Sequence, residues 1–266
     1  MKRLAAELLI IVIGILLALG VDEWRQDRAQ LRVVGEHLSN VAAELRSNLC
    51  SVERIRARAL QRKLDGLQVV LRFLQDPAPV VQDPTALLLS FARSSSAAMP
   101  WLADNQYQAL QNSGNARLVD ELVPGLRLAG TYEGPRVLFA QVERIQGAYP
   151  IVVNELMPAQ LQPRFSLLRG YAQGSEAPAL EDDAELSRAV ERIHARRTQL
   201  LDLARNEAAV ATAQWYALER LRQNYQTDLE TLRPWDKDTT PLEEQLAACR
   251  EAQIPQLQAP PPPSLP

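Results

Sequence analysis

The segment LRVVGEHLSNVAAELRSNLCSVERIRARA, residues 31–59, repeats apolar side chains at alternating intervals of three and four residues. This spacing places them on one face of an α-helix and is typical of a coiled-coil seam or a long bundle helix. The seam positions are Leu31, Val34, Leu38, Val41, Leu45, Val52, Ile55 and Ala59. The helical pattern extends from Asp22 to Gln75, about 80 Å if unbroken. It is expected to end at Asp76-Pro77.

A second long helix is predicted from about Ala184 to Leu232, where nearly the same spacing recurs after the acidic start Asp182-Asp183. Aromatic residues make up only 5% of the chain and there are eleven glycines, so the composition favours helices over sheets. We therefore predict an all-α fold. Residues 25–233 are expected to form an elongated helical bundle around two long antiparallel helices.

Shorter helices are expected between these two. Asp83 and Pro84 are typical of an N-cap and first helical residue, and Gly114 is expected to close a helix over 101–113. Residues 116–160 keep a helical period but contain several breakers, so we predict two or three helices or one kinked helix. The breakers are Pro124, Gly134-Pro135, Gly147 and Pro150.

The carboxyl-terminal segment 234–252 contains Thr240-Pro241 with Glu243, a capping box with proline at the first helical position. It predicts one short helix. Residues 253–266 are proline-rich and too poor in varied apolar side chains to pack. They are expected to be a disordered tail, or else a docking peptide for a proline-binding groove.

Before the long helix lies the apolar run LLIIVIGILLALGV, Leu8–Val21. Counted from Leu4 it is eighteen residues, about 27 Å of helix, which approaches the thickness of a bilayer core but includes Glu7. Trp24 suits the headgroup region. We predict a cytoplasmic stub at 1–7 and a transmembrane anchor at 4–24.

The alternative to an anchor is a cleaved signal peptide. Lys2 and Arg3 form a basic start, and Ala18-Leu19-Gly20 would serve as a cleavage site. Glu7 interrupts the expected transition to the apolar core, and the helical pattern continues past Gly20 without a break. These two features favour a retained anchor.

The stretch ELLIIVIGILLALGVDEWRQDR, residues 7–28, resembles the start of an uncharacterised family of bacterial single-span membrane proteins. The resemblance rests on Glu7, Gly14, Ala18-Leu19 and Trp24, with a fainter similarity at 107–114. It implies a retained membrane helix and no activity. Gly20 departs from the family pattern, which more often has a longer polar residue there, and this departure leaves the cleavage alternative open.

Glu7, Gly14 and Ala18 fall on one stripe of the predicted membrane helix. Gly14 and Ala18 form a small-xxx-small pair, which allows membrane helices to approach closely. The stripe indicates lateral self-association or contact with another membrane protein. The alternative is that small residues are simply frequent in membrane helices.

The sequence contains no pattern that indicates an enzyme. The net charge of −3 gives no basic surplus for nucleic acid, and only two histidines occur. Glu191-x-x-His194 resembles half of a di-iron motif, but a single copy cannot assemble that site, so a solvated helix face is the expected role. We predict no catalytic, cofactor-binding or metal-ligating residues.

Cys50 and Cys249 are the only cysteines. An even pair in an exported protein suggests a disulfide, and two buried free thiols are the alternative. This pair favours a periplasmic body on the bacterial inner membrane over a cytoplasmic one. The one basic cluster contains Arg54, Arg56, Arg58, Arg62 and Lys63, of which Arg54, Arg58 and Arg62 share one helix face, and a surface ion-pair network is expected there.

Two functions remain. The first is a membrane-anchored structural or protein-interaction module, with the lipid bilayer and a membrane protein as partners. The second is an exported ligand-sensing helical bundle that signals through a partner membrane protein, because a seven-residue stub cannot carry an output domain.

Overall fold

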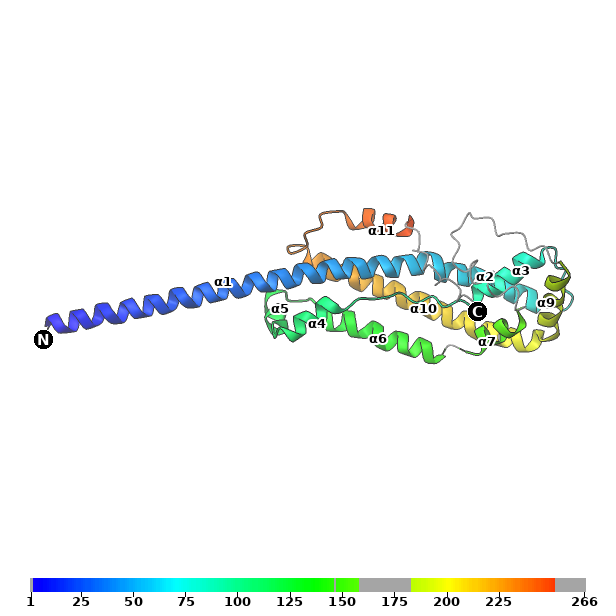
Figure 1. The fold of residues 1–266 in the computed structure, drawn as a ribbon, viewed down its shortest axis with the longest axis horizontal. Helices are drawn as coiled ribbons and strands as arrows, with labels where there is room; N and C mark the ends of the chain where they lie inside the picture. Colours follow the sequence, from blue (N-terminus) through cyan, green and yellow to red (C-terminus); the bar gives the residue numbers. More distant parts are fainter. Residues whose placement is uncertain (1, 146, 158–182, 252–266) are drawn as a thin grey trace, which may run out of the picture. The chain divides into compact units, whose positions relative to one another are not determined.

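The computed structural model describes residues 2–145, 147–157 and 183–251; within the helices, the side chains of residues 2–12, 143–145 and 183 are outside the description. Every regular element in these ranges is a helix, which confirms the predicted all-α class (Figure 1). The elements are α1 (Lys2–Arg54), η1 (Ile55–Leu60), α2 (Gln61–Gln75), α3 (Pro84–Ser94), α4 (Asn105–Asn112), α5 (Ala116–Leu122), α6 (Leu128–Ile145), α7 (Tyr149–Leu156), α9 (Asp183–Ala195), α10 (Arg197–Leu232) and α11 (Leu242–Glu251).

The first long helix is uninterrupted from α1 through η1 to α2, as its apolar period predicts. Its seam is buried from Val34 to Val52, whereas Leu31 is 45% exposed. The helix ends at Asp76, which is extended because a residue before proline avoids the helical region. The π-helical turn η1 was not predicted, because one extra residue per turn leaves little trace in an apolar period.

The chain packs as two compact units. Unit 1 combines Met1–Ser47, Ala103–Leu128 and Gln226–Thr239. Unit 2 combines the described residues within Asn48–Leu102, Ala129–Tyr225 and Thr240–Pro266. The helices α1 and α10 each contribute residues to both units, so a domain boundary is not visible along the sequence.

In unit 1 the core is the α1 seam, covered by α4, α5 and the end of α10. Arg46 Nε donates to Asp236 Oδ2 at 2.7 Å. Glu44 Oε2 accepts from the backbone N–H of Gln106 at 2.9 Å, at the start of α4. These two contacts attach α4 and the segment after α10 to the same stretch of α1.

In unit 2 the helices α2 and α3 pack closely against each other and meet at Gly66. A Cβ at Gly66 would lie 2.9 Å from the carbonyl oxygen of Ser90. On its other side, α2 pairs with α10 in antiparallel order. Lys63 lies against Glu207, and further along the chain the Asp76 carbonyl accepts from Arg197.

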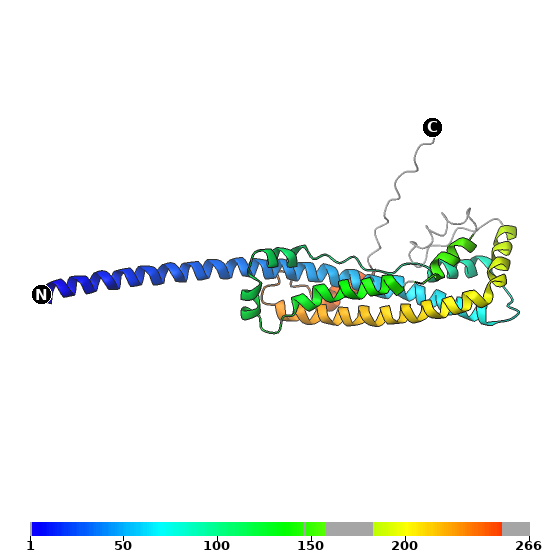
Figure 2. The same cartoon turned by 90° about the horizontal axis from the view of Figure 1, so that it is seen from below.

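The predicted continuous helix from Ala184 to Leu232 is wrong, because the chain turns at Arg196. There the N–H of Arg196 donates to Ile193 O, three residues back, at 3.1 Å. The turn directs α9 across the end of α10 and onto α3 and α7 (Figure 2). The apolar period continues through both helices because each buries one face, so the period does not record the change of direction.

Two smaller predictions have different outcomes. Gly114 has φ +74° just after α4, as a helix-terminating glycine requires, although α4 begins at Asn105 and not at Trp101. The break predicted at Gly134-Pro135 is wrong, because α6 continues through Pro135.

Among the described residues, no helix is both long enough and apolar enough to cross a membrane. The proline-rich tail 253–266 lies outside the described residues.

Candidate functional site

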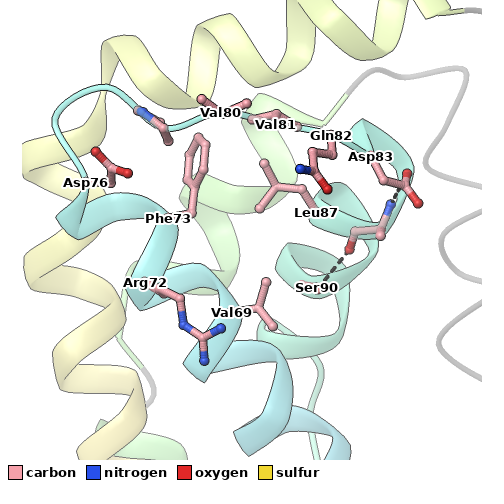
Figure 3. Close-up of a pocket in the computed structure, with 12 residues that line it drawn as sticks. Val69, Arg72, Phe73, Asp76, Val80, Val81, Gln82, Asp83, Leu87 and Ser90 are labelled. Atoms are coloured by element: carbon pink, nitrogen blue, oxygen red, sulfur yellow. Dashed lines mark hydrogen bonds between the residues drawn. The ribbon is translucent and has the colours of Figure 1, made fainter.

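One concave part of unit 2 lies between α2, α3 and the connection between them. A cavity of about 400 Å³ lies there, with Phe73 and Leu87 on opposite sides (Figure 3). A second cavity, of about 480 Å³, lies toward α9. Phe73, Pro79 and Val81 line both cavities, so the connection passes between two apolar hollows.

Local sequence explains why this connection is open. Prolines at 77 and 79 carry no N–H to donate, and Asp83 begins α3 as an N-cap by accepting from Ala86 N at 2.9 Å. Gly66 brings α2 and α3 together two turns earlier. The helices therefore touch at Gly66, while the larger Phe73 and Leu87 hold them apart near the connection.

The second cavity contains the Glu191-x-x-His194 pair. Both side chains are exposed on α9, and the His194 ring lies 6.4 Å from Phe73 in an edge arrangement. In the part of the chain that the structure describes, no three His, Cys, Asp or Glu side chains gather in a metal-binding arrangement. The pair thus lies on a solvated face with one aromatic contact.

The two cysteines are joined in a disulfide, with S–S 2.04 Å and Cα atoms 5.3 Å apart. The bond connects α11 to α1 within unit 2. Next to it, Arg250 Nε lies 2.6 Å from Oε1 of Glu53, whose side chain is fully buried. Helix α11 is thus attached to α1 by one covalent bond and one ion pair at adjacent residues.

Glu53 is the acidic centre of this attachment. Burial raises the pKa of its carboxyl, but hydrogen bonds from Arg250 and Arg56 outweigh burial, so the pKa lies below its ordinary value of 4.5. Arg56 also lies 3.4 Å from Glu219 and over the ring of Trp215 at 5.4 Å. One arginine therefore links α10 to the same carboxylate that holds α11.

The predicted basic face of Arg54, Arg58 and Arg62 lies at and beside η1. Arg54 Nη2 donates to Cys50 Sγ at 3.8 Å, and Arg62 Nε donates to the Arg58 carbonyl at 3.0 Å. The pKa of Arg62 lies below its usual range, first because of burial and then because Arg93 and Arg58 are nearby cations. The three side chains therefore face partly buried surroundings.

Sequence reasoning missed the buried polar core of unit 2. Lys63 Nζ lies 2.5 Å from Glu207 Oε1 and donates to the Ser96 carbonyl at 3.0 Å. Both charged side chains are at most 3% exposed. Ser94 and Tyr149 share a hydrogen bond of 2.6 Å, and burial raises the pKa of Tyr149. A single charged residue in a helix carries no sign of its burial, so the sequence does not distinguish Lys63 from the neighbouring basic side chains.

Of the predicted membrane-helix residues, Gly14 and Ala18 are exposed, and nothing lies within 4 Å of a Cβ built at Gly14. The Glu7 side chain is outside the description. Trp24 is 55% exposed, with the Arg28 guanidinium 4.5 Å from its ring centroid. No residue of another helix is brought against this stripe in the described part of the chain.

Comparison with family models, curated proteins and solved structures finds no match to this chain. The resemblance of residues 7–28 to a family of single-span membrane proteins stays a prediction.

Proposed function

We propose that this chain is a membrane-anchored helical protein whose body acts as a structural or protein-interaction module. The observation that carries the proposal is a row of large apolar side chains left exposed on α1. They are 46–65% exposed, and they are Ile13, Ile15, Leu16, Leu17, Leu19 and Val21.

These side chains point in all directions around the helix, because positions 13, 15–17, 19 and 21 follow no helical period. A helix that is apolar on every side is stable when it is surrounded by lipid or by protein. The proposed span also includes residues 4–12, of which only the backbone is described. Lipid can surround this helix without any additional protein chain. The Trp24 ring, with the Arg28 guanidinium over it, suits the headgroup region of a bilayer.

The disulfide supports a body on the periplasmic side of a bacterial inner membrane, with the amino terminus in the cytoplasm. Disulfides persist in oxidising compartments and are rare in the cytosol. A body in the cytoplasm remains the alternative, and there Cys50 and Cys249 would be recovered as thiols. On the periplasmic side the helices would form a stalk that presents its surface to a partner.

Extraction of membranes with alkaline carbonate tests the anchor. The full chain should stay in the membrane fraction with its amino-terminal residues present, and Leu16→Arg/Leu17→Arg should release it, because each central arginine costs about 2.5–3.5 kcal/mol. Val33→Arg, on an exposed residue of the same helix beyond the span, is the matched control. Release of the unmodified chain, or a first residue at Val21, would refute the proposal. A compartment-specific reporter at the carboxyl terminus tests orientation.

We also propose lateral association of the anchor through Glu7, Gly14 and Ala18. Close approach of two helices at Gly14 allows a polar contact at Glu7. The yield of crosslinked oligomer in membranes should fall in Glu7→Gln/Gly14→Leu and should be unchanged in Leu17→Ile. An unchanged yield in the first variant would remove this part of the proposal.

The two cavities beside Phe73 favour a second candidate function, an exported ligand-sensing bundle. Ligand sites are typically concave, mostly apolar and about 300–1,000 Å³ in volume. The two cavities, at about 400 and 480 Å³, fall within this range of volume and have mainly apolar surfaces. Any signal would then pass through a partner membrane protein.

A further inference from the structure

We infer that the cavity between α2 and α3 takes a small amphipathic carboxylate, with its apolar body beside Phe73 and its carboxylate on Arg72. This inference rests on the second candidate function and names the class of ligand. The lining includes five apolar side chains beside Arg72 and the connection, of which Phe73 and Leu87 are buried: Val69, Phe73, Val81, Ala86 and Leu87. An aromatic or short aliphatic body would therefore bury its surface there.

The charged groups at the cavity differ in whether they already have partners. Asp83 accepts from Ala86 N at the α3 N-terminus, where the helix dipole also favours a negative charge. Asp76 Oδ1 accepts from Ala78 N at 2.9 Å. Figure 3 shows these two carboxylates at opposite ends of the connection. Each is held by backbone N–H groups of its own turn.

Arg72 is the one cation in the lining, and it makes no hydrogen bond or ion pair with another residue in the described part of the chain. Its guanidinium lies beside Val69, below Phe73 (Figure 3). A planar guanidinium matches a carboxylate with two parallel hydrogen bonds, and the exposed Arg72 side chain is accessible to a ligand that enters from solvent. An apolar hollow with one available guanidinium at its edge fits an amphipathic acid.

Three probes of nearly equal shape test the inference: 4-phenylbutyrate, 4-phenylbutanol and 4-phenylbutylamine. Each is titrated at neutral pH by calorimetry into the full chain in lipid nanodiscs, with empty nanodiscs subtracted. The acid should bind roughly tenfold more tightly than the alcohol, the scale of a hydrogen bond to a charged group, and the amine should bind most weakly.

Two variants locate the effect. Arg72→Gln should remove the preference for the acid and leave the alcohol unchanged, whereas Arg188→Gln on α9 should keep the preference. Ala86→Phe should fill the cavity and abolish binding of both, with Ala213→Phe as the matched control on an exposed face of α10. Far-ultraviolet circular dichroism checks that each variant is folded.

Equal affinity for acid and alcohol, or tighter binding of the amine, would overturn the ligand class while leaving a ligand-binding cavity in place. A preference for the acid that survives Arg72→Gln would overturn the role of this arginine. Absence of binding by all three probes, or binding that survives Ala86→Phe, would overturn the inference and the second candidate function with it.

Discussion

The buried pair of Lys63 and Glu207 provides the sharpest test of how unit 2 is held together. Both side chains are at most 3% exposed, and their charged atoms are 2.5 Å apart. In the described part of the chain Glu207 Oε1 accepts no hydrogen bond, so the opposite charge of Lys63 stabilises it. Removing one charge leaves the other buried without compensation.

We expect Glu207→Gln to lower the free energy of unfolding by about 3–5 kcal/mol, the usual cost of breaking a buried pair. For a chain of this size the loss corresponds to a fall in Tm of roughly 6–20 °C, at about 2–4 °C per kcal/mol. Denaturant unfolding of the disulfide-intact protein, followed by circular dichroism, measures it. The matched control is Glu121→Gln, whose partner Arg117 is 92% exposed and whose loss should cost less than about 1 kcal/mol.

The double variant Lys63→Met/Glu207→Leu separates charge from packing. It removes both charges, which is often neutral or stabilising, but it leaves the Ser96 carbonyl without its donor, at a cost of about 1–3 kcal/mol. Its stability should therefore lie within about 2 kcal/mol of the unmodified protein. A double variant as unstable as Glu207→Gln would refute this account of the pair.

Three further predictions concern other contacts. Gly66→Ala should destabilise unit 2 by about 1–3 kcal/mol, because its Cβ would approach the α3 backbone at 2.9 Å, whereas Gly130→Ala in α6 meets nothing and should be neutral or stabilising in the same melt. The pKa of Glu53 is lower in the folded protein than its ordinary value of 4.5, so its ionised carboxyl stabilises the fold above pH 4.5. This contribution is lost as the pH falls through the lowered pKa. The difference in the free energy of unfolding between Glu53→Gln and the unmodified protein should therefore shrink in strong acid. A pH-independent difference would contradict this linkage. Reducing the disulfide between Cys50 and Cys249, which are 199 residues apart, should lower the free energy of unfolding by up to about 5 kcal/mol. Unfolding is measured with and without dithiothreitol, and the double serine variant, which cannot form the bond, should not respond to the reductant.

The helices were predictable where one physical rule acts locally. Asp76-Pro77 ends α2 and Asp83-Pro84 begins α3, because proline and a capping carboxylate act within a single turn. The turn at Arg196 was not predictable, because α9 and α10 each bury an apolar stripe. The same apolar spacing continues through both helices, so it does not show that the helix axis changes direction between them. The passage of α6 through Pro135 is a further case in which the surrounding fold prevails over local preference.

The candidate site was less accessible to sequence reasoning. The cavity walls come from three segments, and no motif marks them; the paired prolines between α2 and α3 were the nearest signal. The roles of charged residues depend on partners distant in the chain. Arg72 and Lys63 lie on the same helix nine residues apart, yet one lies at the edge of a cavity and the other is 3% exposed against Glu207.

The buried charges also explain how α2 and α10 choose one alignment. Their apolar seams are built mostly from Leu, Val and Ala at regular intervals, so a shift of one heptad, about 10 Å along the axis, would still bring apolar side chains together. The same shift would separate Lys63 from Glu207, which are 3% and 1% exposed. Each of these two buried charges would then lose its partner, at a cost of several kcal/mol. Uniform seams thus supply the attraction between the helices, and the buried ion pair favours a single register.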